Sequence, residues 1–154
     1  MKPGEAGFLK EMQYEALYVP KGSAPFPREI VENPAIAKYY ENWGRPGDMA
    51  IVAVDQKAEI LVGAIWARRF TAEHPGYGFV DEQTPELSIA LLPPFRAQGI
   101  GTKLLGSFIS LARQKKIAAL SLSVDGTNPA LRLYLRFGFK EVKPGDSPTL
   151  LLKL

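Results

Sequence analysis

A glycine-rich turn between a strand-like segment and a long amphipathic segment places the strongest constraint on how this chain can fold. Residues 86–92 carry their larger apolar side chains on one face, which predicts a strand. Residues 99–116 carry apolar side chains at helical spacing, which predicts a helix beginning beside Gly99 and Gly101. A strand that leads directly into an amphipathic helix brings that helix against a sheet, so we expect a mixed α/β or α+β fold.

The remaining segments extend this pattern over one expected domain, residues 1–154, a length typical of single domains. Periodicity and turn residues predict the following elements in chain order: a helix at 5–18, a helical region broken at Pro34 and closed at Trp43-Gly44, a hairpin of 49–54 and 60–70, a loop at 71–85, the strand at 86–92, the helix at 99–116, a strand at 120–124, a short helix from Asn128-Pro129 to Gly138, and strands at 139–142 and 149–154. The longest helix is therefore expected in the second half of the chain.

Composition narrows the range of functions. The chain has no cysteine and a single histidine, His74, which argues against disulfides, a thiol nucleophile and a metal site. The net charge of +3 forms no basic stripe, so nucleic acid is not an expected partner. No apolar run is long enough to cross a membrane, and the amino-terminal residues lack the layout of a signal peptide. We therefore expect a cytoplasmic protein without membrane contact.

The segment from Leu91 to Thr102 has the features of an anion-binding turn. Gly99 and Gly101 let the backbone bend tightly and let a bulky anion approach the N–H groups. The first turn of a helix has unpaired N–H donors and the positive end of the helix dipole, which suit a phosphate or diphosphate. Arg96 would add positive charge. The alternative interpretation is a helix entry whose glycines only permit close packing.

Two common phosphate-binding motifs do not fit this turn. A Walker A loop needs Gly-Lys-Ser/Thr, whereas Gly101 is followed by Thr102 and then Lys103. The dinucleotide fingerprint needs a third glycine at the position where this chain has Leu104.

The hexapeptide Arg96-Ala97-Gln98-Gly99-Ile100-Gly101 resembles the acetyl-CoA signature of the GNAT superfamily of N-acetyltransferases, Arg/Gln-x-x-Gly-x-Gly/Ala. Residues 130–139 resemble the family's second signature, Ala-x-x-x-Tyr-x-x-x-Gly-Phe, and Asn128 stands one residue closer to the alanine than is typical. The resemblance covers residues 48–139 well. It implies a mixed, mostly antiparallel sheet flanked by helices.

The amino-terminal end departs from the family pattern. The family usually begins with a strand before its first helix, but only Met1 and Lys2 precede Pro3 here. The first edge strand is therefore expected to be missing or replaced. An open sheet edge is one reason to consider a homodimer.

The resemblance implies acetyl-CoA as the acetyl donor. Main-chain N–H groups in the glycine turn would hold its diphosphate, and its pantetheine arm would lie between the strands 86–92 and 120–124. The N–H of Leu91 would polarise the thioester carbonyl. Asn128 would contact the pantetheine arm, although it also fits the role of a helix cap. The expected cofactor-binding residues are Leu91, Leu92, Arg96, Ala97, Gln98, Gly99, Ile100, Gly101, Thr102, Asn128 and Leu131.

Two side chains are candidates for the proton transfers of acetyl transfer to an amine. Tyr134, the tyrosine of the second signature, would act as general acid, because a phenol is protonated at neutral pH and can assist a departing thiolate. The alternative is a core aromatic residue. Glu86 would accept the amine's proton directly or through water; the alternative is a solvated charge at the start of a strand.

The acceptor amine is less well defined by the sequence. Residues 71–86 contain four acidic side chains and no lysine or arginine, a local negative patch that would suit a cationic amine, small or peptidic. Tyr39, Tyr40 and Trp43 are candidates for its apolar walls, although a solvated loop and core aromatics explain the same residues. A non-catalytic acyl-CoA-binding sensor or regulatory module is the alternative function.

Overall fold

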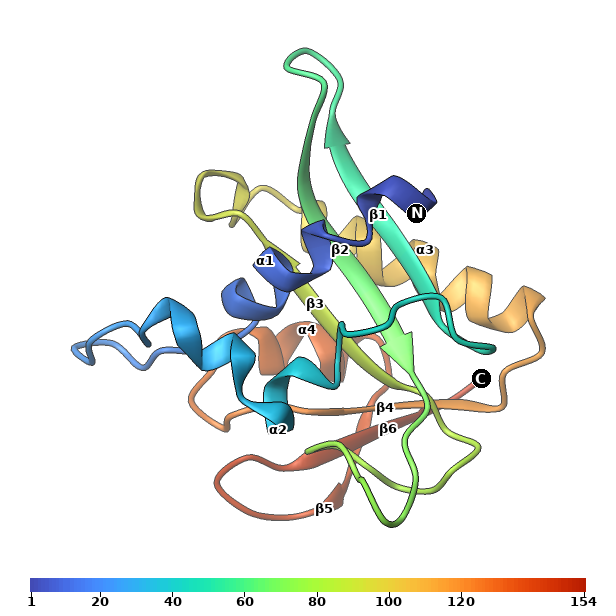
Figure 1. Cartoon of the computed structure of the whole chain (residues 1–154). Helices are drawn as coiled ribbons and strands as arrows, with labels where there is room; N and C mark the ends of the chain where they lie inside the picture. Colours follow the sequence, from blue (N-terminus) through green and yellow to red (C-terminus); the bar gives the residue numbers. More distant parts are fainter.

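The structure is a computed structural model that describes all 154 residues. Its elements, in chain order, are η1 (Pro3–Glu5), α1 (Phe8–Glu15), η2 (Arg28–Glu32), α2 (Pro34–Ala37), β1 (Met49–Asp55), β2 (Ile60–Arg68), β3 (Glu86–Leu91), η3 (Pro93–Phe95), α3 (Ile100–Gln114), β4 (Ala119–Ser123), α4 (Ala130–Arg136), β5 (Lys140–Lys143) and β6 (Thr149–Lys153) (Figure 1). Here η denotes a 3-10 helix. None of the helices is both long and apolar enough to span a membrane.

The six strands form one sheet in the order β1-β2-β3-β4-β6-β5. All neighbours are antiparallel except β3 and β4, which are parallel and are joined by a single register pair, Glu86 with Ser121. Beyond that pair the two strands separate. The predicted mixed and mostly antiparallel sheet is confirmed, and the separation lies between the two strands that the resemblance indicated.

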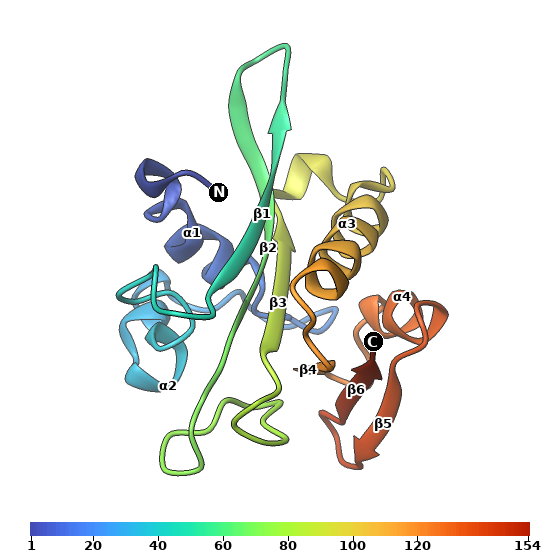
Figure 2. The ribbon, with the colours of Figure 1, turned by 90° about the vertical axis from the view of Figure 1, so that its right-hand side faces the viewer.

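Helices cover both faces of the sheet. Figure 2 shows α1 and α2 on one side of β1, β2 and β3, and α3 and α4 on the other. The larger core lies under α3 and α4, where Phe108 and Leu105 of α3 are fully buried against strands from both halves of the sheet. A smaller core lies under α1 and contains Leu9, Met12 and Trp66. Each face of β3 therefore belongs to a different core.

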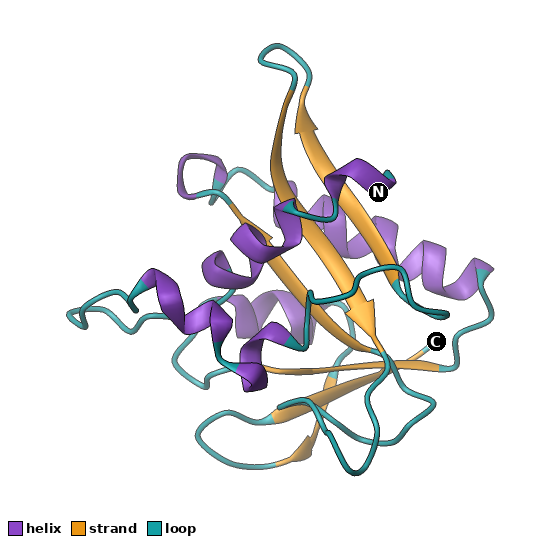
Figure 3. Ribbon diagram, in the orientation of Figure 1, coloured by secondary structure: helices purple, strands orange, loops and turns teal.

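The two ends of the chain differ in how well periodicity predicted them. From β1 onwards the predicted elements are present, with bounds shifted by a few residues, and α3 is the longest helix (Figure 3). The predicted helix at 5–18 is shorter at both ends in the structure: α1 covers Phe8–Glu15 and begins after Gly7, and η1 precedes it. The break near Pro34 is confirmed, because Asn33 caps α2 and Pro34 is its first residue.

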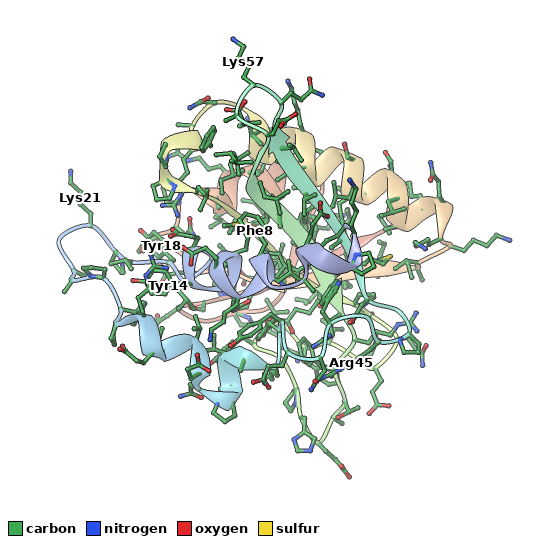
Figure 4. All side chains as sticks on the ribbon, turned by 45° about the horizontal axis from the view of Figure 1, so that its top comes forward. Phe8, Tyr14, Tyr18, Lys21, Arg45 and Lys57 are labelled. Carbon is green, nitrogen blue, oxygen red and sulfur yellow. The ribbon has the colours of Figure 1, made fainter.

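No strand precedes α1, and β1 forms one edge of the sheet. No backbone hydrogen bond joins its outer side to another segment of the chain. The tip of the β1–β2 hairpin, marked by Lys57 in Figure 4, extends beyond the body of the sheet. The expected difference from the family pattern at this edge is therefore present in the fold.

A buried ion pair fixes the segment after α2 against the sheet. Arg68, at the end of β2, is 1% exposed and bonds both carboxylate oxygens of Asp48, at 3.0 and 2.6 Å. Its guanidinium also donates to the main-chain carbonyls of Lys38, Glu41 and Asn42. These bonds satisfy a charge that would be costly to bury alone. They also hold the turn that carries Tyr39 close to the start of β3.

Candidate functional site

The glycine turn between β3 and α3 presents six consecutive main-chain N–H groups that have no partner within the protein. These are the N–H groups of residues 97–102; the next one, that of Lys103, bonds the carbonyl of Gly99. No side chain caps them, because Gly99 occupies the cap position. Residues 97–99 and 102 are exposed, so the donors lie at the surface. Unpaired N–H groups at the positive end of a 15-residue helix have the geometry and polarity that suit an anion.

The backbone of this turn is held in a shape that points several N–H groups to one side. Ala97 and Gly99 both have left-handed φ values, 57° and 79°, and alternate with residues of negative φ. Such alternation makes a concave nest of N–H groups that binds anions. The left-handed conformation costs Ala97 about 1 kcal/mol or more, whereas it costs Gly99 little. Strain of this kind is typical of ligand-binding turns.

The side chain of Arg96 points away from the turn. Its Nε donates to the carbonyl of Leu91 at 3.0 Å, and its Nη2 forms an ion pair with Glu15 at 2.7 Å. It therefore ties the end of α1 to the end of β3, and the expected electrostatic contribution of Arg96 to anion binding stays a prediction. Thr102 and Lys103 are exposed in the first turn of α3.

The end of β3 directs main-chain groups into the region where β3 and β4 separate. Leu92 donates its N–H to Val62 of β2, at 2.9 Å. Because bonding alternates along an antiparallel pair, the N–H of Leu91 is directed to the opposite side, towards β4. Gly63 opposes Leu91 on β2, and a side chain at Gly63 would collide with that leucine. The role expected of the Leu91 N–H stays a prediction, while the N–H of Leu92 is bonded within the sheet.

The carboxyl end of α1 crosses the place where the sheet opens. Arg96 holds Glu15 on the β3 side, and the hydroxyl of Tyr18 donates to the carbonyl of Thr127, at 3.1 Å, on the β4 side. Figure 4 shows Tyr18 in the segment that follows α1. Segments 109 residues apart in the sequence are joined by this bond. One wall of the opening is therefore formed by α1.

The helix that carries Tyr134, α4, lies beside the glycine turn. Tyr134 is 7% exposed, with its ring edge-to-face on Phe139. A side chain added at Gly101 would contact both Leu133 of α4 and Leu91 of β3, each at 3.9 Å, so these three elements meet. Burial raises the pKa of Tyr134 well above its usual value, and its hydroxyl has no hydrogen-bond partner in the protein. The phenol is therefore protonated at neutral pH, and its hydroxyl is free to donate a hydrogen bond or a proton.

Asn128 and Leu131 lie at the start of α4. The Oδ1 of Asn128 accepts from the N–H of Ala130 at 2.9 Å, which is the capping role expected for it. Its contact with a cofactor stays a prediction. Leu131 packs against the larger core. A hollow of about 300 Å³ is lined by Gly126, Thr127, Asn128, Pro129, Leu131 and Arg132.

Glu86 is buried, not solvated, at the start of β3. It is 4% exposed, and its Oε1 accepts from the hydroxyl of Tyr39 at 2.6 Å and from the N–H of Gly78 at 2.8 Å. Its Oε2 has no hydrogen-bond partner. Burial raises the pKa of Glu86, an effect opposed by the bonds from Tyr39 and Gly78 and by the charge of Lys38.

The link between Tyr39 and Glu86 was not predicted from the sequence. Tyr39 was considered only as an apolar wall, yet its hydroxyl bonds a carboxylate 47 residues away. The same hydroxyl accepts the N–H of Tyr77 at 2.7 Å. No spacing or motif signals such a bond, because it depends on how the turn after α2 packs on β3.

The acidic residues of the loop 71–85 mostly serve the loop itself. Asp81 accepts from the N–H groups of Gln83 and Thr84, and Glu82 accepts from that of Ala72. His74 is exposed. Of the expected acceptor walls, Tyr40 bonds the carbonyl of Val31 and Trp43 packs at the smaller core. No group of three or more potential metal-ligating side chains is clustered in the structure.

Comparisons with known proteins agree with the fold. The family model described as "Acetyltransferase (GNAT) family" matches residues 11–139. The [ribosomal protein bS18]-alanine N-acetyltransferase of Haemophilus influenzae is 40% identical over 63 residues, which cover 41% of this chain and 42% of that protein. The chain spans less than half the length of the curated relatives that it matches.

Solved structures are similar over nearly the whole chain. The ribosomal-protein-alanine N-acetyltransferase of Brucella melitensis has a TM-score of 0.69 at 23% identity, covering 100% of this chain and 97% of its own. The PaiA N-acetyltransferase of Thermoplasma acidophilum, in complex with coenzyme A, has a TM-score of 0.65 at 17% identity, covering 100% and 96%. Because the family model spans most of the sequence and the fold agrees, the chain belongs to the GNAT family of acetyltransferases.

Proposed function

We propose that this protein transfers an acetyl group from acetyl-CoA to a primary amine, with both substrates bound at once. The observation that carries the proposal is the row of six unpaired N–H groups at residues 97–102. They offer a diphosphate several main-chain donors at the positive end of a helix, without a charged side chain. The coenzyme's thioester end would then extend along Leu91, into the opening between β3 and β4.

Tyr134 and Glu86 provide the two proton transfers that the reaction needs. A new N–C bond forms to the acetyl carbon while the C–S bond breaks, so the amine must lose a proton and the thiolate must gain one. Tyr134 donates a proton to the sulfur, since its buried phenol is protonated and uncommitted. Glu86 accepts the proton of the amine at Oε2, through water, because the carboxylate is almost fully buried.

The Leu91 N–H contributes electrostatic stabilisation. As the amine attacks, negative charge develops on the carbonyl oxygen of the acetyl group. A fixed main-chain donor pointing into the opening stabilises that charge without reorganising. The role of α1 is to wall the opening and limit the access of bulk water.

The acceptor is proposed to be a primary amine on a small molecule or a peptide. The relatives include an N-acetyltransferase acting on an alanine of a ribosomal protein, which supports a peptide amine. Lys38 lies near Glu86 and contacts the loop at the carbonyl of Pro75. Because a positive side chain already lies in this region, a polycation gains less from the loop than its acidic composition suggests.

A non-catalytic acyl-CoA-binding module is the second candidate. The observation that favours it is the cover over Glu86: a side chain at Gly76 would collide with Oε2, so the main chain of the loop lies directly on this oxygen. In such a module the carboxylate would only organise the loop. Both candidates share the anion site at residues 97–102.

Two measurements on the full chain test the proposal. Titration calorimetry with CoA and acetyl-CoA should show binding, and release of free thiol should follow addition of an amine from a panel containing an alanyl peptide, a lysine peptide and spermidine. Binding without turnover on any amine would favour the non-catalytic module. No binding of either CoA compound would remove the proposal entirely.

A further inference from the structure

The carboxylate of Glu86 is bonded unequally at its two oxygens. Oε1 accepts two hydrogen bonds, from Tyr39 at 2.6 Å and from the N–H of Gly78 at 2.8 Å. Oε2 accepts none, although it is buried. A buried carboxylate oxygen without a partner is costly and calls for an explanation. Oε2 lies under the main chain of Gly76, and it is the one oxygen of this carboxylate that can still accept a hydrogen bond or a proton.

The direction of the Tyr39 hydroxyl is determined by its other neighbour. The main-chain N–H of Tyr77 donates to the same hydroxyl oxygen at 2.7 Å. An N–H can only donate, so the oxygen of Tyr39 is the acceptor in that bond, and its proton is left to point at Oε1 of Glu86. The chain of donors therefore runs in one direction, from Tyr77 through Tyr39 to Glu86.

The ring of Tyr39 is itself fixed. It is 5% exposed, packs edge-to-face on Phe70 with ring centres 5.0 Å apart, and stacks on Tyr77 at 6.4 Å. Burial, with Glu86 nearby, raises the pKa of Tyr39 far above its usual value, so the hydroxyl stays protonated wherever the enzyme is folded. It is thus a permanent donor held in one position.

The other charged groups around the carboxylate do not replace this donor. Lys38, beside Tyr39 after α2, bonds the carbonyl of Pro75 and lies 5.6–6.0 Å from the three ring centres of Tyr39, Phe70 and Tyr77. Arg68, the neighbour of Glu86 on β2, is bound to Asp48. Across the sheet on β4, Ser121 is neutral. Tyr39 is therefore the one side chain that bonds Glu86 directly.

We infer that Tyr39 is a positioning residue for Glu86: its hydroxyl fixes Oε1 and leaves Oε2 as the oxygen that accepts the amine's proton. The inference deepens the proposed function and rests on the role proposed there for Glu86. Its physical basis is that a hydrogen bond to the charged form of a buried carboxylate favours ionisation, which burial opposes. Tyr39 thereby keeps a base available at the pH where amines are acetylated.

The test is Tyr39→Phe, which retains the ring and its contacts with Phe70 and Tyr77 but removes the hydroxyl. The pKa of the Glu86 carboxyl is measured by carbon NMR on glutamate-labelled protein, with the resonance assigned by its loss in Glu86→Gln. A charge-assisted hydrogen bond is worth enough to raise this pKa by about one to two pH units when it is removed. The acid limb of kcat/KM, measured with acetyl-CoA and the best amine of the panel, should move upward by the same amount.

The matched control is Tyr14→Phe, which likewise removes one tyrosine hydroxyl. In Tyr14 this hydroxyl donates to the main-chain carbonyl of Phe26, away from Glu86. The control should leave both the NMR titration and the acid limb in place. An unchanged Glu86 pKa in Tyr39→Phe would overturn the inference whatever the enzyme's activity. A second outcome is that Tyr39→Phe raises the Glu86 pKa while the acid limb of kcat/KM persists in Glu86→Gln. Glu86 would then not be the base, and the structural role of Tyr39 would still stand.

Discussion

The two ends of β3 present different kinds of functional group. At its carboxyl end, the proposed binding groups are main-chain N–H donors that lie at the surface and come from six adjacent residues. At its amino end, the proposed proton acceptor is one carboxylate, 4% exposed, held by partners 8 and 47 residues away. The first end is built by local backbone geometry, and the second by the packing of distant segments.

This difference has a consequence for how each end responds to substitution. The N–H donors survive any change of side chain that leaves the backbone conformation intact. The carboxylate depends on a hydroxyl, a loop amide and the buried pair of Arg68 and Asp48 that holds the turn after α2. We therefore expect changes near Glu86 to alter proton transfer and stability, and changes near Gly99 to alter coenzyme binding.

The largest expected effect concerns Tyr134 of α4. Tyr134→Phe should lower kcat by about 10²–10⁴-fold, because the departing thiolate loses its proton donor. Its hydroxyl has no partner in the protein, so stability and CoA affinity should change little. Steady-state kinetics and calorimetry on the same preparation check this. Equal turnover in the two proteins would show that Tyr134 is only a core residue.

Asp48→Ala tests whether the amino end of β3 depends on distant packing. Arg68 would be left buried without its partner, which typically costs about 3–5 kcal/mol of unfolding free energy. Urea denaturation measures the loss, and Glu11→Ala serves as the control because it breaks an exposed pair with Arg28, worth at most about 1 kcal/mol. CoA affinity of the folded variant should be nearly unchanged. A similar loss of stability in both variants would contradict the comparison.

Gly99→Val tests the carboxyl end. Nothing lies within 4 Å of an added side chain at Gly99, so the effect comes from its left-handed φ of 79° and not from a clash. A left-handed conformation costs a non-glycine residue about 1–2 kcal/mol, more for a β-branched one, so CoA affinity should fall about 10- to 30-fold.

Gly101→Ala is the matched control for that substitution, because Gly101 has no positive φ and an added methyl group makes only ordinary contacts. Calorimetry with CoA should show nearly native affinity for it. If Gly101→Ala weakened binding as much as Gly99→Val, the backbone shape at residue 99 would not be the deciding property.

The smallest expected effect is a pH-dependent change in stability for Glu86→Gln. Because the folded-state pKa of Glu86 is raised, the folded protein binds this proton more tightly than the unfolded chain does. The contribution of Glu86 to stability is therefore fully present below its unfolded pKa and is lost as the pH rises through the folded pKa. Glutamine does not titrate, and its amide oxygen can accept the same two hydrogen bonds.

As the pH rises through that window, the unfolding free energy of Glu86→Gln should therefore increase relative to that of the parent protein. The increase should be about 1.4 kcal/mol per unit of pKa shift. Each kcal/mol corresponds to roughly 2–4 °C of Tm. Thermal unfolding from pH 4.5 to 8 measures the increase, with Glu73→Gln in the exposed part of the loop as the control for loss of a charge. A constant difference between Glu86→Gln and the parent protein would indicate that burial does not perturb this carboxyl.

The sequence by itself determined the features that arise within a few residues of one another. The alternation of residues 86–92, the helical stripe of 99–116 and the glycines at 99 and 101 were sufficient to predict the strand, the longest helix and the glycine turn between them, because backbone geometry follows local residue types. The two signatures were also sufficient to identify the family, and the absence of a strand before α1 could be anticipated.

Only the tertiary structure decided the environment of Glu86 and the side-chain direction of Arg96. Glu86 is buried because the loop at Gly76–Gly78 and the turn carrying Tyr39 both pack on the start of β3. Arg96 points to Glu15 because α1 crosses the end of that strand. Hydrogen bonds and burial of this kind depend on which segments become neighbours after folding, and residue spacing along the chain carries no record of them.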